Sequence, residues 1–369
     1  MSKYKTSKRL GFEIVLGIVA LAGVALFLEH GSGSHSIEPS VDSPRASFSK
    51  PYASSDKSSV VTPTEESFTE ENPTEEIVNI DISQAFPGMT LYPTSGSAEI
   101  LLVNIAGKIV HRWDIDADRA RLLSDGSILV IHGSKWGLAR EPWASLRSVV
   151  RRYSWEGKVL WEKKLPEDAH HDVQILPNGN ILALYLTHVE PNELTDKRPE
   201  KLRGVQIRSD VIEEISPSGE SVWKWEAHNH LSLDSCGARP CSKVTKKHLT
   251  GQDPYDWTHI NTISVIPENR WFDAGDTRFR PGNIIVMARN FWQAMIVDRE
   301  TKNVVWTYSG DYKGGISGGH EPVMIEKGLP GAGNILIFDN GRVSEESRLL
   351  ELDPTSKKIV WLYDVGEKF

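Results

Sequence analysis

Short apolar runs separated by turn residues recur along the chain from about residue 85 to its end. In one pattern a turn precedes a strand that ends on Val-Trp or a close variant. Its tryptophans are Trp113, Trp161, Trp223, Trp306 and Trp361.

In the other pattern a glycine turn precedes a strand rich in Ile and Leu. Its turn glycines are Gly126, Gly179, Gly282 and Gly333. Asp-Gly and Asn-Gly supply the positive φ of tight hairpin turns, and the flanking residues suit a pleated surface. Each pattern therefore predicts a β-hairpin.

Two hairpins make four antiparallel strands, and a four-stranded unit that recurs roughly every 50 residues is typical of a β-propeller blade. The gap between Gly179 and Gly282 is about twice the others but holds only Trp223 as a strand marker. We interpret it as one repeat with polar insertions at roughly 226–256 and 267–280. The fifth repeat stops at Phe369 without its second hairpin. The pattern predicts an all-β propeller over residues 81–369, incomplete at its C-terminus.

The N-terminal segment does not fit this pattern. Four basic residues precede an apolar run from Leu10 to Leu28 that only Glu13 interrupts, long enough to span a bilayer. The positive flank predicts residues 1–29 as a cytoplasmic tip and transmembrane signal-anchor, with the globular part exported to the periplasmic or extracellular side. A cleaved signal peptide, cut near Ala22, is the alternative. Residues 30–80 are rich in Ser, Pro, Thr and Glu, which predicts a disordered tether.

Net charge and cysteine content bear on which partners the protein binds and on the role of its two cysteines. The net charge of -8 argues against a nucleic-acid partner, which would need a basic face. The two cysteines, Cys236 and Cys241, lie close together in a chain that we expect to be exported, which favours a local disulfide. A redox or metal-binding pair is the alternative, although no second cysteine pair exists to complete a thiolate site.

Histidines recur where the inner strands of three repeats should begin. They occur in His170-His171-Asp172, in Trp257-Thr258-His259-Ile260-Asn261 and in Gly319-His320-Glu321. The first repeat has Asp118 and Arg119 in the same region. A single histidine is usually structural, but ring symmetry would bring three at one repeat position to a common point near the axis. This arrangement favours a functional cluster of His171, His259 and His320.

Arg289 follows the apolar strand that ends near Val286. A buried arginine is costly unless it is paired or meets an anion, so either a salt bridge to Asp298 or Glu321 or an anion site would explain it. Three histidines and an arginine permit two chemistries. One is a zinc or copper site, which Arg289 disfavours by repulsion; the other is a nucleophilic imidazole that accepts an anionic group.

At these residues the sequence resembles the arylsulfate sulfotransferase family of periplasmic propeller enzymes. The matching segments are His170-His171-Asp172, Leu176-Pro177-Asn178-Gly179-Asn180, Asp256-Trp257-Thr258-His259-Ile260-Asn261, Arg289, His320 and Phe338-Asp339-Asn340-Gly341. The resemblance covers roughly residues 85–369 and implies a six-bladed propeller, from which this chain lacks about one and a half blades.

The resemblance also implies a reaction, the transfer of a sulfuryl group from a phenolic sulfate to a phenol without a cofactor. By that likeness His320 is the nucleophile, and His171, His259 and Arg289 hold the sulfuryl oxygens. His170 is then expected to contact substrate, as is Asn261, which would also orient His259. Two alternatives remain at this point, a propeller that binds a ligand or partner without catalysis and a metal-dependent enzyme. The sequence indicates nothing about the oligomeric state.

Overall fold

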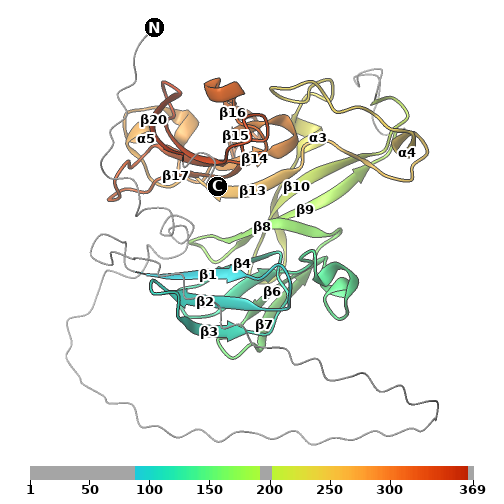
Figure 1. The fold of residues 1–369 in the computed structure, drawn as a ribbon, viewed down its shortest axis with the longest axis vertical. Coiled ribbons are helices and arrows are strands. Elements are labelled where there is room, and N and C mark those ends of the chain that lie inside the picture. The colour runs from blue at the N-terminus through green and yellow to red at the C-terminus, as the bar shows by residue number, and fades with distance from the viewer. Residues whose placement is uncertain (1–87, 192–201, 365–369) are drawn as a thin grey trace, which may run out of the picture.

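Five antiparallel sheets follow one another along the chain in the computed structural model, which describes residues 88–191 and 202–364. We call them blades 1 to 5. Figure 1 shows them in chain order, from blade 1 (strands β1–β3, teal) at the bottom to blade 5 (strands β17–β20, red) at the top. Successive inner strands pack on one another, β1 on β4, β4 on β8, β8 on β13 and β13 on β17. The all-β propeller architecture is thus confirmed.

The strand bounds are as follows. Blade 1 contains β1 (Met89–Pro93), β2 (Ile100–Asn104) and β3 (Ile109–Trp113), and blade 2 contains β4 (Arg119–Leu122), β5 (Ile128–Ile131), β6 (Val149–Tyr153) and β7 (Val159–Lys164). Blade 3 contains β8 (Ala169–Ile175), β9 (Ile181–Val189), β10 (Ile207–Ile215) and β11 (Ser221–Glu226), with β12 (Tyr255–Asp256) parallel to β10. Blade 4 contains β13 (Ile260–Val265), β14 (Ile284–Ala288), β15 (Gln293–Val297) and β16 (Val304–Tyr308). Blade 5 contains β17 (His320–Met324), β18 (Ile335–Asp339), β19 (Arg348–Asp353) and β20 (Lys358–Asp364).

Helices are short and lie in the loops. They are η1 (Gly137–Ala139), η2 (Ala144–Leu146), α3 (Ala227–His230), α4 (Lys246–Leu249), α5 (Arg270–Asp273), η4 (Thr277–Phe279), η5 (Arg289–Phe291) and η6 (Tyr312–Gly314). The two insertions expected from the sequence lie between β11 and β12 and between β13 and β14. The first carries the Cys236–Cys241 disulfide, whose Cα atoms are 5.0 Å apart, so the predicted pairing is confirmed.

The core is divided among the interfaces between blades. In the described residues four hydrophobic clusters each join two successive blades, from blades 1 and 2 to blades 4 and 5. Strand β5 shows the logic, because side chains alternate between the two faces of a strand. Its Ile128 and Val130 pack toward blade 1, while Leu129 and Ile131 pack toward blade 3. Both faces of this strand are covered, which explains its continuous apolar sequence.

The recurring tryptophans also have a structural role. Each lies on the outer strand of its blade, and its indole N–H donates to a carbonyl in the outer hairpin turn of the next blade. The bonds are Trp113 to Ser154 (3.2 Å), Trp161 to Pro217 (3.0 Å), Trp225 to Lys302 (3.0 Å), Trp223 to Arg299 (2.9 Å) and Trp306 to Pro354 (2.7 Å). Trp361 of blade 5 continues the series, but the described residues offer it no such carbonyl. The tryptophan pattern therefore fastens each blade to its successor.

Two expectations from the sequence are corrected. The described residues form five blades rather than six, and the sheet with fewer strands is blade 1, not the C-terminal one. The second difference arises because each repeat begins at a different hairpin from the one that the sequence analysis assumed. The glycine-turn hairpin supplies the two inner strands of a blade, and the tryptophan strand is its outer edge, so each repeat begins with the glycine hairpin. Blade 5 thus ends on its own Trp361 strand with four strands present.

The predicted anchor at 1–29 and tether at 30–80 lie outside the described residues. Among the residues that are described, no helix has the length and apolar character needed to cross a membrane.

Candidate active site

The three candidate histidines lie at the same end of neighbouring inner strands. His171 is in the first half of β8, His259 immediately precedes β13, and His320 begins β17. Each strand has an irregular register here, where the inner strand gains residues relative to its partner. His320 pairs directly with Phe338, whereas the other two lie outside the regular pairing. The histidines therefore share one end of the axis without sharing one register position.

Backbone strain accompanies these irregularities. His171 has φ of 58°, His259 has φ of 48° and Glu321, next to His320, has φ of 47°. A side chain in this left-handed region costs on the order of 1–3 kcal/mol and persists only where the surroundings enforce it. Such strain gathers at functional sites because it aims side chains that a regular strand would direct elsewhere.

His171 lies in the interior of the cluster. Its ring centroid is 4.9 Å from that of His259 and 5.1 Å from that of His170. Burial, followed by the charges of His170, His259, Arg289 and His320, lowers the pKa of His171 to about 2. His171 is consequently neutral in ordinary buffers.

His170 lies behind His171 and supports it. The two Nδ1 atoms are 2.9 Å apart, so one of them donates and the other accepts. On its other side, His170 Nε2 approaches Asp210 Oδ1 at 3.1 Å without hydrogen-bond geometry. Asp210 also accepts a hydrogen bond from the Ile260 backbone N–H at 2.8 Å. The structure thus places His170 between a carboxylate and His171.

His259 is held by a carboxylate. Its Nδ1 lies 2.5 Å from Asp256 Oδ2, and the Asn290 amide donates to the same oxygen at 3.2 Å. The opposite nitrogen of the ring, Nε2, is buried and has no hydrogen-bond partner among the described residues. Burial alone would raise the pKa of Asp256, but the hydrogen bond and charge of His259, with the charge of Arg208, bring it below its usual value. Asp256 is therefore ionised and acts only as an acceptor.

His320 has a defined tautomer. Its Nδ1 lies 3.0 Å from the Gly318 carbonyl oxygen and 2.6 Å from Asn340 Oδ1. A carbonyl oxygen can only accept, so Nδ1 carries the hydrogen and Nε2 keeps its lone pair. Burial lowers the pKa of His320, and the charges of Arg289 and Arg342 lower it further, against the two hydrogen bonds that raise it. The imidazole is thus neutral and nucleophilic at Nε2 near neutral pH.

Two arginines contribute positive charge to this region. Arg289 begins the η5 turn; its Nη2 is 3.8 Å from Asp256 Oδ2, and its buried Nε has no hydrogen-bond partner among the described residues. Neither Asp298 nor Glu321, its partners in the salt-bridge interpretation, pairs with it. Arg342 approaches Gly318 so closely that an added Cβ there would lie 2.5 Å from its Nε. Glycine at 318 therefore leaves room for a second guanidinium near His320.

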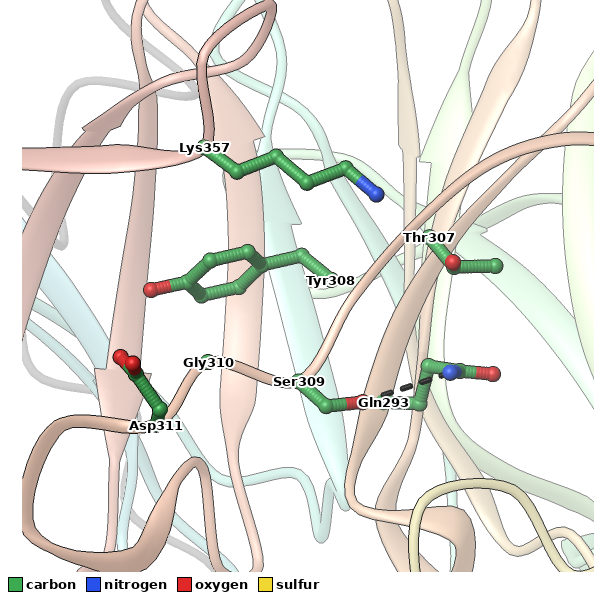
Figure 2. A pocket seen from close by; sticks show the side chains of 7 residues that line it. All are labelled: Gln293, Thr307, Tyr308, Ser309, Gly310, Asp311 and Lys357. Carbon is green, nitrogen blue, oxygen red and sulfur yellow. Dashed lines mark hydrogen bonds between the residues drawn. The ribbon is translucent and has the colours of Figure 1, made fainter.

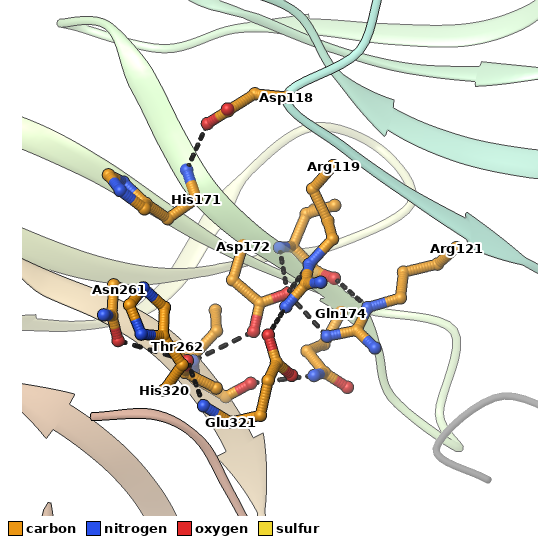
Figure 3. A network of polar contacts seen from close by, with 12 residues as sticks. Asp118, Arg119, Arg121, His171, Asp172, Gln174, Asn261, Thr262, His320 and Glu321 are labelled. Carbon is orange, nitrogen blue, oxygen red and sulfur yellow. Dashed lines mark hydrogen bonds and ion pairs between the residues drawn. The ribbon is translucent and has the colours of Figure 1, made fainter. Parts of the chain in front are cut away.

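Ion pairs link the inner strands next to the histidines. Asp172, fully buried in β8, accepts from Arg121 at 2.6 Å and pairs with Arg119 at 3.3 Å. It also accepts the Ile263 backbone N–H of β13 at 3.0 Å. Arg119 reaches Glu321 as well, so this network joins β4, β8, β13 and β17 around the axis. Figure 3 shows the carboxylates of Asp172 and Glu321 directed at the Arg119 guanidinium.

Asn261 has a different role from the expected one. Its side-chain amide donates to the Gly319 carbonyl oxygen at 3.0 Å, and it is almost fully buried. It therefore fixes the segment that carries His320 and does not bond to His259, which Asp256 orients instead. Figure 3 shows Asn261 and Thr262 close to His320.

Comparison with known families shows which protein family the chain belongs to. The sequence model of the family described as "Arylsulfotransferase (ASST)" matches residues 83–368. This chain belongs to the arylsulfotransferase family.

No curated protein matches the chain. Solved structures that are similar include a protein of unknown function from Bacteroides caccae, with 13% identity, coverage of 76% of this chain and 74% of that chain, and a TM-score of 0.44. Another is hydrazine synthase from Kuenenia stuttgartiensis, with 10% identity, coverage of 72% and 68%, and a TM-score of 0.42. For this arylsulfotransferase-family protein, membership implies small-molecule substrates such as phenolic compounds.

A surface hollow of about 400 Å³ lies away from the histidines. Gln293, Tyr308, Asp311 and Lys357 are among its lining residues, and Figure 2 shows the Tyr308 ring between Lys357 and Asp311. None of the histidines and neither Arg289 nor Arg342 lines it. Within residues 88–191 and 202–364, no group of three or more His, Cys, Asp or Glu side chains is arranged to hold a metal ion.

Several residues next to the candidate histidines were not singled out from the sequence. Asp256 bonds to His259, Asn290 donates to Asp256, Asn340 bonds to His320, and Arg342 adds charge. Asp256 and Asn340 occur in the segments that carry the family resemblance, and Asp256 precedes His259 by three residues as Asp168 precedes His171. The Asp-x-x-His spacing was thus a signal for Asp256, whereas Asn340 has no such repeat signal. Arg342 has no signal beyond its position two residues after Asn340.

Proposed function

We propose that this arylsulfotransferase-family protein transfers a sulfuryl group from an aryl sulfate to a phenol through a sulfohistidine at His320. The observation that carries the proposal is the tautomer of His320. The Gly318 carbonyl holds the ring hydrogen on Nδ1, which leaves a lone pair on Nε2 of an imidazole whose pKa is lowered. A neutral, oriented imidazole is a nucleophile.

The chemistry proceeds in two balanced steps. In the first, His320 Nε2 attacks sulfur, the bond between sulfur and the aryl oxygen breaks, and the departing phenolate takes a proton from a histidine of the cluster. In the second, the acceptor phenol returns a proton to that histidine while its oxygen attacks sulfur and the bond to His320 breaks. By microscopic reversibility, one site serves both directions.

The surrounding charges suit the transferred group. A sulfuryl group has three oxygens that carry negative charge, and by analogy with phosphoryl transfer its transition state is loose, so positioning and electrostatic stabilisation supply most of the rate. Arg289 has a buried N–H without an acceptor, as expected for a donor that is completed by substrate. With the neutral ring of His171, it would hold the sulfuryl oxygens.

The test is turnover with a chromogenic aryl sulfate and a phenol acceptor. The wild type should release the donor phenol and sulfate the acceptor, and His320→Asn should reduce the rate on the order of 10⁴-fold or more, because it removes the attacking group. The control His111→Asn changes a histidine of blade 1, on β3, and should retain activity.

A second measurement separates catalysis from binding. The enzyme is mixed with donor alone, quenched at alkaline pH and digested, and the peptide containing His320 is examined by mass spectrometry for an added sulfuryl group. An adduct on this peptide, absent from His320→Asn, is the expected result. Donor that binds without turnover and without any adduct would instead identify a non-catalytic binding propeller.

The proposal includes the location. The basic and apolar N-terminal sequence and the Cys236–Cys241 disulfide both suit a single-pass membrane protein whose propeller is exported, since disulfides persist in oxidising compartments. A reporter enzyme that is active only after export, fused after Phe369, should be active.

A further inference from the structure

Asp256 lies outside the regular strands of the propeller. It belongs to β12, a two-residue strand at the end of the first insertion, which pairs in parallel with β10 through Ile207 and Arg208. This pairing places Asp256 opposite Arg208, and the segment that follows leads directly to His259. The insertion thus returns to the propeller with a carboxylate at the edge of the histidine cluster.

The contacts of Asp256 define which nitrogen of His259 carries the hydrogen when the ring is neutral. Since the carboxylate only accepts, His259 donates its Nδ1 hydrogen across the 2.5 Å contact. The remaining nitrogen, Nε2, is buried and has no hydrogen-bond partner among the described residues, and the ring centroids of His259 and His171 are 4.9 Å apart. The side-chain amide of Asn290 donates to the backbone carbonyl oxygen and to the carboxylate of Asp256. These two bonds fix the carboxylate in place.

Of the three candidate histidines, His259 alone has a hydrogen bond to a carboxylate in the described residues. His320 contacts a carbonyl and an amide, and His171 contacts another imidazole. An adjacent carboxylate stabilises an imidazolium, whereas the neutral partners of the other two rings do not. His259 is therefore equipped to carry a proton on Nε2 while His320 keeps a free lone pair. This is the division of labour between acid and nucleophile that sulfuryl transfer requires.

We infer that Asp256 is a positioning residue that makes His259 the proton donor to the departing phenolate and the proton acceptor from the incoming phenol. The inference rests on the sulfuryl transfer proposed above and adds a role to that site. As the bond between sulfur and the aryl oxygen breaks, the proton on His259 Nε2 moves to the phenolate oxygen. His259 becomes neutral with its Nδ1–H still on Asp256, and the acceptor phenol restores the Nε2 proton in the second step.

A test follows from the dependence of proton donation on the leaving group. A phenolate without activating substituents departs poorly without a proton, whereas 4-nitrophenolate is stable enough to depart unaided. Asp256→Asn should therefore lower kcat/KM for phenyl sulfate about 10²-fold or more and change that for 4-nitrophenyl sulfate by less than about threefold. Asp253→Asn removes a nearby, more exposed carboxylate from the same insertion and should leave both rates unchanged.

The outcomes separate the two proposals. Equal losses on both donors, or no loss on either, would overturn the role of Asp256 while leaving sulfuryl transfer intact. A wild type that transfers nothing and forms no adduct at His320 would instead contradict the proposed function itself. Circular dichroism checks that the variants fold. If Asp256→Asn does not fold, Asp256→Ser provides the same comparison, because a hydroxyl can still accept from Asn290 but cannot stabilise an imidazolium.

Discussion

Two groups of polar residues at the axis differ in how completely they are paired. Asp172, Arg121, Arg119 and Glu321 form a network in which each charge meets an opposite charge. The histidine cluster, one residue away in sequence at His171 and at His320, leaves His259 Nε2 and Arg289 Nε buried and unpaired. Buried polar groups are nearly always hydrogen-bonded, so unpaired ones require an explanation. The first group links the inner strands of the blades, whereas the second keeps unpaired buried N–H and ring-nitrogen groups of the kind that the proposed sulfuryl transfer would use.

The largest expected effect is on stability, from Asp172→Asn. It leaves Arg119 and Arg121 without their buried counter-charge, and breaking a buried pair in this way costs about 3–5 kcal/mol. Burial would raise the pKa of Asp172, but the two arginines bring it below its ordinary value of 3.8. The stabilisation is therefore present above about pH 4 and is lost as the pH falls through the lower, folded-state pKa.

Urea unfolding at neutral and acidic pH measures this effect. The gap between wild type and Asp172→Asn should narrow as the pH falls. A variant as stable as the wild type at neutral pH would show that the network contributes nothing, and the comparison with the histidine cluster would fail.

The next effect is on turnover, from Arg289→Gln. Removing one donor to a developing negative charge typically costs about 10²–10³-fold in kcat. Because the guanidinium is buried without a full set of partners, its loss should leave the free energy of unfolding unchanged or slightly increased. Steady-state kinetics and urea unfolding on the same preparation measure both. Destabilisation on the scale of Asp172→Asn would assign Arg289 to the structural group instead.

The smallest effect is a shift in pH dependence, from Arg342→Gln. Burial lowers the pKa of His320 and the charge of Arg342 lowers it further, so removing that charge raises the pKa. The free nucleophile is then lost at higher pH, so the acidic limb of the kcat/KM profile should move upward. With 4-nitrophenyl sulfate, whose phenolate departs without a proton, the plateau at higher pH should change little. Arg280→Gln, which removes an exposed arginine paired with Glu300, is the control. An unmoved limb would show that solvent screens Arg342 from His320.

Much of the fold can be derived from the sequence because it repeats. Turn glycines such as Gly126 and Gly179 have positive φ, and the outer-strand tryptophans recur because each bonds the next blade. The hairpin at which each repeat begins is not evident from the sequence, since a hairpin in isolation does not reveal which of its strands is innermost. That ambiguity placed the shorter sheet at the wrong end of the propeller.

The residues of the candidate site likewise include some that the repeats reveal and some that they do not. His171, His259 and His320 could be selected because they recur at strand starts, and the structure brings His171 and His259 into ring contact. Asn290 and Asn340 could not, because they follow the ends of strands whose sequences differ between blades. Their roles come from contacts between separate segments, Asn290 with Asp256 and Asn340 with His320, which no local pattern encodes.

The contact between Arg119 and Glu321 has a consequence for the order of folding. It joins residues 202 positions apart, across the axis from blade 2 to blade 5. Contacts of such sequence separation form late, because a long loop must close before they are gained. Glu321 is covalently next to His320, so the proposed nucleophile reaches its place only when the last blade docks. A nascent or partly folded chain should therefore show no activity until all five blades have assembled.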